Sequence, residues 1–108
     1  MRVVLAALIL VGFASPAFAQ AGDSGAITLL RTGWNSDSFA IAMTGPIQNP
    51  ANCPTPDGYI SHSSLPGYNT YYAAALTAYV AKQPVLVTIH NTECFAGRPK
   101  LIGINFGN

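Results

Sequence analysis

The chain has 108 residues, half of them hydrophobic and only 8% charged, with a formal net charge of +1. That length suits one small domain, and the near-neutral charge argues against a nucleic-acid-binding protein, which needs a clustered basic surface. So few ionisable side chains also leave little for acid–base chemistry, and we expect a protein that is not an enzyme.

The first 19 residues read as a signal peptide. Met1-Arg2 gives a short positive start, residues 3–13 form an apolar run too short for a membrane span, and Ala17-Phe18-Ala19 fits a small-residue cleavage site. The sequence therefore predicts a periplasmic or secreted protein that begins at Gln20 and has no membrane span. From Gln20 onward basic and acidic residues balance, so the formal net charge of this part is zero.

Two strands joined as a hairpin are predicted next. Residues 26–32 read as the first strand, and the turn residues Gly33-Trp34-Asn35-Ser36-Asp37 follow it. Phe39, Ile41 and Met43 then alternate with small residues in the cleanest period-two pattern of the chain.

The segment that follows predicts an irregular loop and a disulfide. Residues 45–58 contain four prolines, which excludes a central strand, and residues 59–63 form a short third strand. In an exported chain the two cysteines, Cys53 and Cys94, are expected to pair. The loop so closed is about 41 residues long, for which the chain-entropy relation gives roughly 4 kcal/mol of stabilisation. No metal or cofactor site is expected, because no C-x-x-C motif occurs.

Residues 69–81 predict one uncharged helix, which Pro84 ends. Helical spacing gives it an apolar face for the core, formed by Tyr72, Ala75, Leu76, Tyr79 and Val80. The opposite face is small and uncharged where a monomer would carry Lys and Glu, which favours a partner subunit there. We therefore expect a homo-oligomer whose interface includes Ala73, Thr77 and Ala81.

Residues 85–90 and 100–106 predict a fourth and a fifth strand, joined by a loop that holds Cys94. Three strands, a helix and two strands make up the order of the oligonucleotide/oligosaccharide-binding (OB) fold, a five-stranded, partly open Greek-key barrel. We expect a mainly β domain of this OB-fold type over residues 20–108, with a small two-layer α+β sheet as the alternative.

Three segments resemble the B subunit of subtilase cytotoxin and related small exported proteins. They are the Tyr- and Ala-rich helix followed by Gln83-Pro84-Val85, the strand start Ser24-Gly25-Ala26-Ile27-Thr28, and Gly58-Tyr59-Ile60-Ser61-His62-Ser63. The resemblance implies an OB-fold barrel, a pentameric ring of the AB5 toxin kind, carbohydrate binding directed at sialylated glycans, and a catalytic A subunit as protein partner.

The resemblance also implies two site residues. A serine at the start of the first strand binds sialic acid in the toxin lectins, and Ser24, with Asp23 beside it, stands at the matching place. The family's tyrosine on the strand after the helix has no counterpart in Thr88-Ile89-His90.

Two aromatic residues complete the predicted ligand-binding set. Trp34 lies among short polar residues, a composition typical of a sugar-stacking site, and Tyr68 begins a tyrosine cluster at the helix start. His62 and His90 have no recognised nucleophile motif near them, so no catalytic residue is predicted. The sequence thus favours a non-enzymatic binding module for a glycan, with a periplasmic structural or inhibitory protein that docks on another protein as the alternative.

Overall fold

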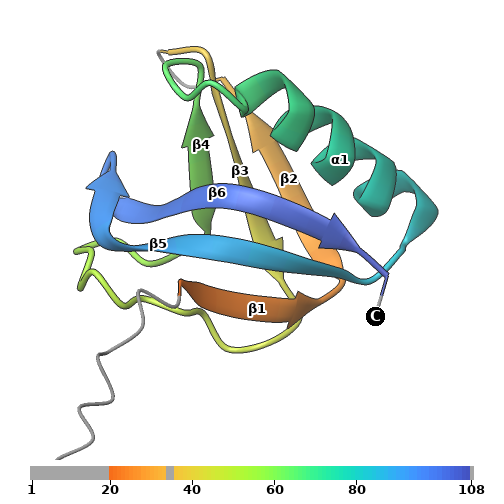
Figure 1. Ribbon diagram of the computed structural model, residues 1–108, viewed down its shortest axis with the longest axis horizontal. Helices are drawn as coiled ribbons and strands as arrows, with labels where there is room; N and C mark the ends of the chain where they lie inside the picture. Colours follow the sequence, from red (N-terminus) through yellow and green to blue (C-terminus); the bar gives the residue numbers. More distant parts are fainter. Residues whose placement is uncertain (1–19, 34–35, 108) are drawn as a thin grey trace, which may run out of the picture.

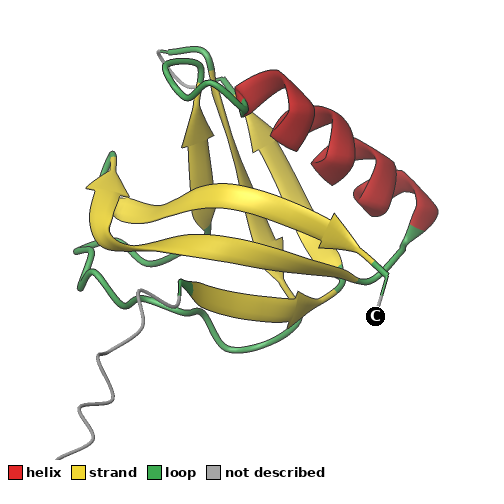
Figure 2. Ribbon diagram, viewed as in Figure 1, coloured by secondary structure: helices red, strands yellow, loops and turns green. Residues whose placement is uncertain are grey.

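The computed structural model describes residues 20–33 and 36–107, so the predicted signal peptide and Trp34 lie outside the described residues. The described part is mainly β with one helix, as expected (Figure 2). Its elements are β1 (Ala21–Gly25), β2 (Ile27–Thr32), β3 (Ser38–Met43), β4 (Tyr59–His62), α1 (Tyr68–Ala81), β5 (Val85–Phe95) and β6 (Arg98–Phe106).

The strands form one mixed sheet in the order β1-β5-β6-β4-β3-β2. The pairing of β4 with β6 is parallel, and the other pairings are antiparallel. Figure 1 shows β1, β5 and β6 running across the direction of β2, β3 and β4, with α1 at one side. The helix packs against β2, β4 and β6. The strands at the two ends of this order, β1 and β2, follow one another directly in the chain.

The predicted count of five strands is wrong, because β1 precedes the predicted first strand. The segment 21–25 is small and polar and carries no alternating apolar pattern, yet it pairs along its length with β5. Gly25, the last residue of β1, has a φ of 153°, and a Cβ there would collide with the Thr44 hydroxyl. Glycine is therefore required at the break between the two strands.

The hairpin of β5 and β6 is longer than predicted. Pairing continues through Cys94↔Pro99 and Phe95↔Arg98, so the predicted loop between residues 90 and 100 is largely strand with a tight turn at Ala96-Gly97. Ala96 and Gly97 both have positive φ values, as such a turn requires. The register is irregular between Ile89 and Cys94, which hides the strand from a period-two pattern.

The predicted core face of α1 is right only in part, since Tyr72 and Ala75 do contact the core. Ala75 and Ala78 are fully buried, whereas Leu76, Tyr79 and Val80 of the predicted core face are exposed, Val80 by 72%. Rings at the start of the helix set its orientation, because Phe39 contacts Tyr68 and Tyr72 at centroid distances of 5.6 and 5.3 Å. The small side chains of Ala75 and Ala78 then let the helix approach the sheet closely, which explains the rotation of the buried face.

The core lies between the sheet and the helix. Its buried apolar side chains are Ile27, Phe39, Ile41, Tyr59, Ala75, Ala78, Val85, Val87, Ile89 and Leu101. Val85, Val87 and Ile89 alternate along β5 with more exposed residues, as a strand with one buried face requires. Within the described residues, no helix is long and apolar enough to cross a membrane.

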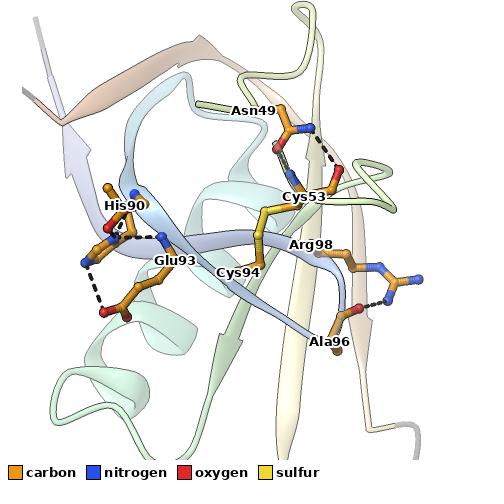
Figure 3. Close-up of a disulfide and its surroundings, with 8 residues drawn as sticks. Asn49, Cys53, His90, Glu93, Cys94, Ala96 and Arg98 are labelled. Carbon is orange, nitrogen blue, oxygen red and sulfur yellow. Dashed lines mark hydrogen bonds and ion pairs between the residues drawn. A yellow bond between two sulfur atoms is a disulfide. The ribbon is translucent and has the colours of Figure 1, made fainter. Parts of the chain in front are cut away.

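The predicted disulfide is confirmed. Cys53 and Cys94 are bonded, with a Cα–Cα distance of 5.8 Å, and tie the loop after β3 to the end of β5 (Figure 3). Asn49 braces the same loop, since its side chain accepts a hydrogen bond from the Cys53 N–H and donates one to the Cys53 carbonyl. Such a bond fits an oxidising, exported compartment.

Candidate functional site

A cavity of about 300 Å³ opens between the loop that follows β2 and the turn of the β5–β6 hairpin. We call it the loop pocket. It is lined by Arg31, Thr32, Gly33, Ser36, Ser38, Phe39, Ala40, Ile60, Phe95, Ala96 and Arg98. These residues come from β2, β3, β4 and the hairpin, so the pocket exists only in the folded sheet.

The loop between β2 and β3 is held closed at its base. The N–H of Gly33 donates to the Ser38 carbonyl at 2.9 Å, and the Ser38 hydroxyl donates to the Gly33 carbonyl at 3.0 Å. Trp34, predicted to bind ligand, lies outside the described residues, but the flanking residues Gly33 and Ser36 both line the pocket. Trp34, the single tryptophan of the chain, therefore stands in the sequence between two residues that line the pocket.

An arginine–aspartate cluster stands beside the pocket. Arg98 donates to both carboxylate oxygens of Asp57, at 2.6 and 3.1 Å, while Arg31 lies 3.7 Å from the same carboxylate. Within the described residues, no carboxylate lines the loop pocket, whereas both arginines do. The cavity thus presents a net positive, donor-rich wall beside the apolar side chains of Ile60 and Phe95.

The ion pairs of Asp57 make the stability of the folded protein depend on pH. The hydrogen bonds and charge of Arg98, with a smaller effect of Arg31, hold the pKa of Asp57 below its ordinary value of 3.8, against the opposing effect of burial. A lowered pKa means that the stabilisation is complete above pH 4 and is lost as the pH falls through the folded-state value.

Asp57→Asn is therefore expected to lower the free energy of unfolding at pH 7 by about 0.5 to 1 kcal/mol, because the carboxylate is half-exposed and screened. Urea unfolding of the variant and the parent protein at pH 7 and pH 2.5 measures this. A difference that persisted undiminished at pH 2.5 would contradict the assignment.

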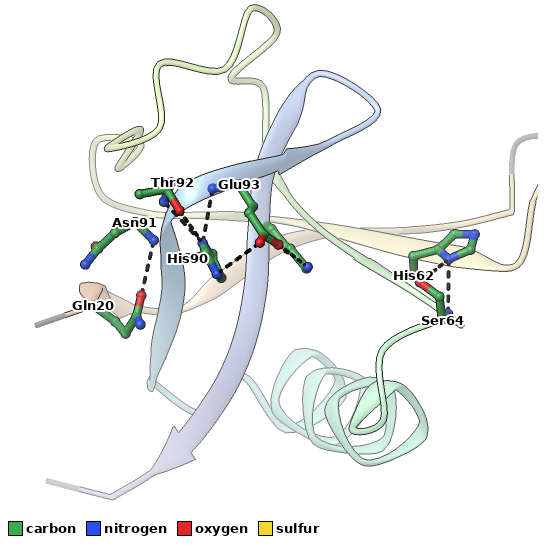
Figure 4. Close-up of polar contacts among 8 residues, drawn as sticks. Gln20, His62, Ser64, His90, Asn91, Thr92 and Glu93 are labelled. Atoms are coloured by element: carbon green, nitrogen blue, oxygen red, sulfur yellow. Dashed lines mark hydrogen bonds and ion pairs between the residues drawn. The ribbon is translucent and has the colours of Figure 1, made fainter. Parts of the chain in front are cut away.

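The two histidines serve as braces for turns (Figure 4). His62 Nδ1 accepts the Ser64 N–H at 3.1 Å, and His90 Nδ1 accepts the N–H groups of Thr92 and Glu93, each at 3.1 Å. His62 Nδ1 also lies 2.9 Å from the Ser64 hydroxyl, so this residue is bound to the ring through both its backbone and its side chain. The His62 ring also lies 4.3 Å from the ring of Phe95 and supports that wall of the pocket.

The remaining predicted ligand residues fall at different places. Tyr68 donates a hydrogen bond to Asp37 at 2.8 Å, and burial together with this bond raises the pKa of Tyr68 to about 12. It thereby ties the helix start to the loop beside the pocket. Ser24 is exposed on β1, while Asp23 is buried and lines a different cavity, so the structure does not bring these two into the loop pocket.

None of the described residues that line the loop pocket was in the predicted ligand-binding set, and Arg31, Phe95 and Arg98 show why. Arg31 lies in the predicted first strand, and Phe95 and Arg98 lie in a predicted loop, so no local motif marked them. Residues from β2 and β6 become neighbours only through the pairing of the whole sheet. No protein-family model, curated protein or solved structure matches this chain, so the chemistry of the pocket carries the functional argument.

Proposed function

We propose that this chain is an exported, non-enzymatic binding module whose loop pocket holds a saccharide. The observation that carries the proposal is the position of the pocket, between the loop after β2 and the turn between β5 and β6. OB-fold proteins bind oligosaccharides and oligonucleotides at the corresponding loops, and the near-neutral charge of the chain disfavours the oligonucleotide.

The strand order supports an OB-like barrel. Ala26, between β1 and β2, accepts a hydrogen bond from the Thr44 N–H at 3.0 Å, so the β2–β3 ladder continues up to the Gly25 break. If β1 and β2 are counted as one bent strand, that strand pairs with β5 at one end and with β3 at the other, an arrangement that would close the sheet. The helix between β4 and β5 and the parallel β4–β6 pair fit the same arrangement.

The lining of the loop pocket suits a sugar. Apolar surface at Ala40, Ile60 and Phe95 can pack against the C–H face of a ring, while the Ser36 hydroxyl and the guanidinium of Arg31 offer hydrogen bonds to ring hydroxyls. A volume of about 300 Å³ lies at the small end of ligand sites and matches a mono- or disaccharide.

Trp34 provides a direct optical test. Because it is the single tryptophan and stands between two lining residues, saccharide binding is expected to shift or quench its emission in a saturable way. Titration of the disulfide-bonded protein with a panel of neutral and acidic mono- and disaccharides measures this. A flat response to every sugar, with a response to free iodide as the control for solvent access, would count against the proposal.

The proposed module assembles into a homo-oligomer, a pentameric ring of the toxin B-subunit kind that would hold an A-subunit-like protein. Support comes from the outer side of α1, where Ala73, Thr77 and Ala81 are exposed beside Leu76 and Val80. That side is free of charge along the whole helix. Solvent-exposed apolar stripes of this kind mark interaction surfaces.

Size-exclusion chromatography with light scattering tests the assembly. The parent protein is expected to elute as a pentamer, and Val80→Lys, which places a charge at a 72% exposed position, is expected to give monomer with an unchanged fold. Lys82→Ala, next to the helix end, serves as the control and should keep the pentamer. A monodisperse monomer of the parent protein at high concentration would exclude the ring.

The alternative function, a periplasmic structural or inhibitory protein, rests on the same exposed residues of α1. In that case Leu76 and Val80 would dock on a different protein, and the parent protein alone would be monomeric and indifferent to sugars. A monomer with a flat tryptophan titration would therefore favour docking on another protein.

A further inference from the structure

A second cavity, of about 160 Å³, shares no lining residue with the loop pocket and contains a buried carboxylate. We call it the Asp23 pocket. Asp23 on β1 is only 6% exposed, and its Oδ2 accepts a hydrogen bond of 2.7 Å from the Tyr59 hydroxyl. Within the described residues Asp23 takes part in no ion pair, although a buried carboxylate normally has a charged partner.

Among the described residues, only one oxygen of Asp23 has a hydrogen-bond donor. The Gln48 N–H donates to the Tyr59 hydroxyl at 2.7 Å, which directs the phenol proton to Asp23 Oδ2. Oδ1 has no partner among the described residues and faces Gly45, where a Cβ would lie 3.3 Å away. Both Asp23 and Gly45 line the cavity, so Oδ1 is open to a donor that enters it.

The other residues that line the Asp23 pocket indicate which kind of ligand fits it. Met43, Ile47 and Pro56 give it apolar sides, and its second acidic residue, Asp57, is already paired with Arg31 and Arg98. None of the described residues that line it is basic. A ligand that matches this lining therefore carries a cationic hydrogen-bond donor on an apolar chain.

We propose that the Asp23 pocket binds an aliphatic ammonium group. An ammonium carries three donors and no acceptor, so one N–H satisfies Asp23 Oδ1 in a charge-assisted bond and another can reach the second lone pair of the Tyr59 hydroxyl. The alkyl stem packs against Met43, Ile47 and Pro56. This site adjoins the loop pocket through the ion pairs of Asp57 but shares no lining residue with it, and the proposal does not rest on saccharide binding there.

Titration of the disulfide-bonded protein with n-butylammonium chloride at constant ionic strength, followed by amide chemical shifts, tests the site. Saturable shifts centred on Gln48 and Gly45 are expected, with none from n-butanol, which has the same stem without the charge. Glycinamide, whose α-amino group lacks the long stem, distinguishes the source of the ammonium group. Binding of butylammonium alone indicates that the natural ligand is a lysine-like side chain. Binding of both compounds indicates that the site also accepts the amino terminus of a chain.

Asp23→Asn keeps an acceptor for Tyr59 and is expected to weaken butylammonium binding at least tenfold. Gly45→Ala leaves the carboxylate in place but crowds Oδ1, so it should weaken binding even if Asp23→Asn fails to fold. Gly103→Ala, whose Cβ meets Thr88 at an ordinary 3.5 Å, is the matched control and should bind like the parent protein. No saturable shift in the parent protein, equal shifts with n-butanol, or undiminished binding by Gly45→Ala would overturn the proposal.

Discussion

Replacing Cys53 and Cys94 together by alanine is expected to lower the free energy of unfolding by about 4 kcal/mol and the Tm by about 20 °C. The bond closes a loop of 41 residues that contains β4, α1 and most of β5. Without it the unfolded chain regains the entropy of that loop, which destabilises the native state. A domain of this size has a total stability of about 5 to 15 kcal/mol, so the loss is a large part of the whole.

Thermal and urea unfolding of the double variant against the oxidised parent protein measure this effect. Reduction of the parent protein is the matched control, since it opens the same loop without changing the sequence, and it should reproduce most of the shift. A double variant within 1 kcal/mol of the oxidised protein would show that the fold does not rely on the bond.

Phe39→Ala is expected to cost about 4 kcal/mol. Its ring is 1% exposed and contacts the rings of Tyr68 and Tyr72, so its removal leaves a cavity and frees the start of α1 from β3. Hydrogen exchange should accordingly quicken in the first turns of α1 before it does so in β5 and β6.

Phe106→Ala is the matched control, because it removes the same ring from a strand position that is 45% exposed. It should cost less than about 1 kcal/mol. Equal losses for the two variants would mean that Phe39 does not anchor the helix.

Local patterns predicted the elements well where large apolar residues alternate with small ones in the sequence. The period-two pattern of Phe39, Ile41 and Met43 lies in β3, and the helix and the disulfide are where the sequence placed them. The strand β1 was missed because residues 21–25 owe their conformation to pairing with β5, a contact about 65 residues away that no local pattern reveals.

Orientation and site assembly were harder to predict than the elements. Both sides of α1 are apolar or small, so spacing alone could not choose the buried one, and the contact of Phe39 with Tyr68 and Tyr72 decides it. The loop that holds Trp34 was recognised as a candidate site from its composition. Arg31 and Phe95 were not, since they meet beside that loop only after the sheet has formed.

The central claim is that the loop pocket binds a saccharide, and a glycan array probed with the parent protein and with Ala40→Leu tests it most directly. Ala40 is nearly buried and lines the pocket, so a leucine there fills the cavity, while Ala51→Leu, in the loop after β3, is the control. We predict a defined set of glycans bound by the parent protein and by Ala51→Leu and lost in Ala40→Leu. Binding that survives in Ala40→Leu, or no binding by the parent protein, would contradict the claim.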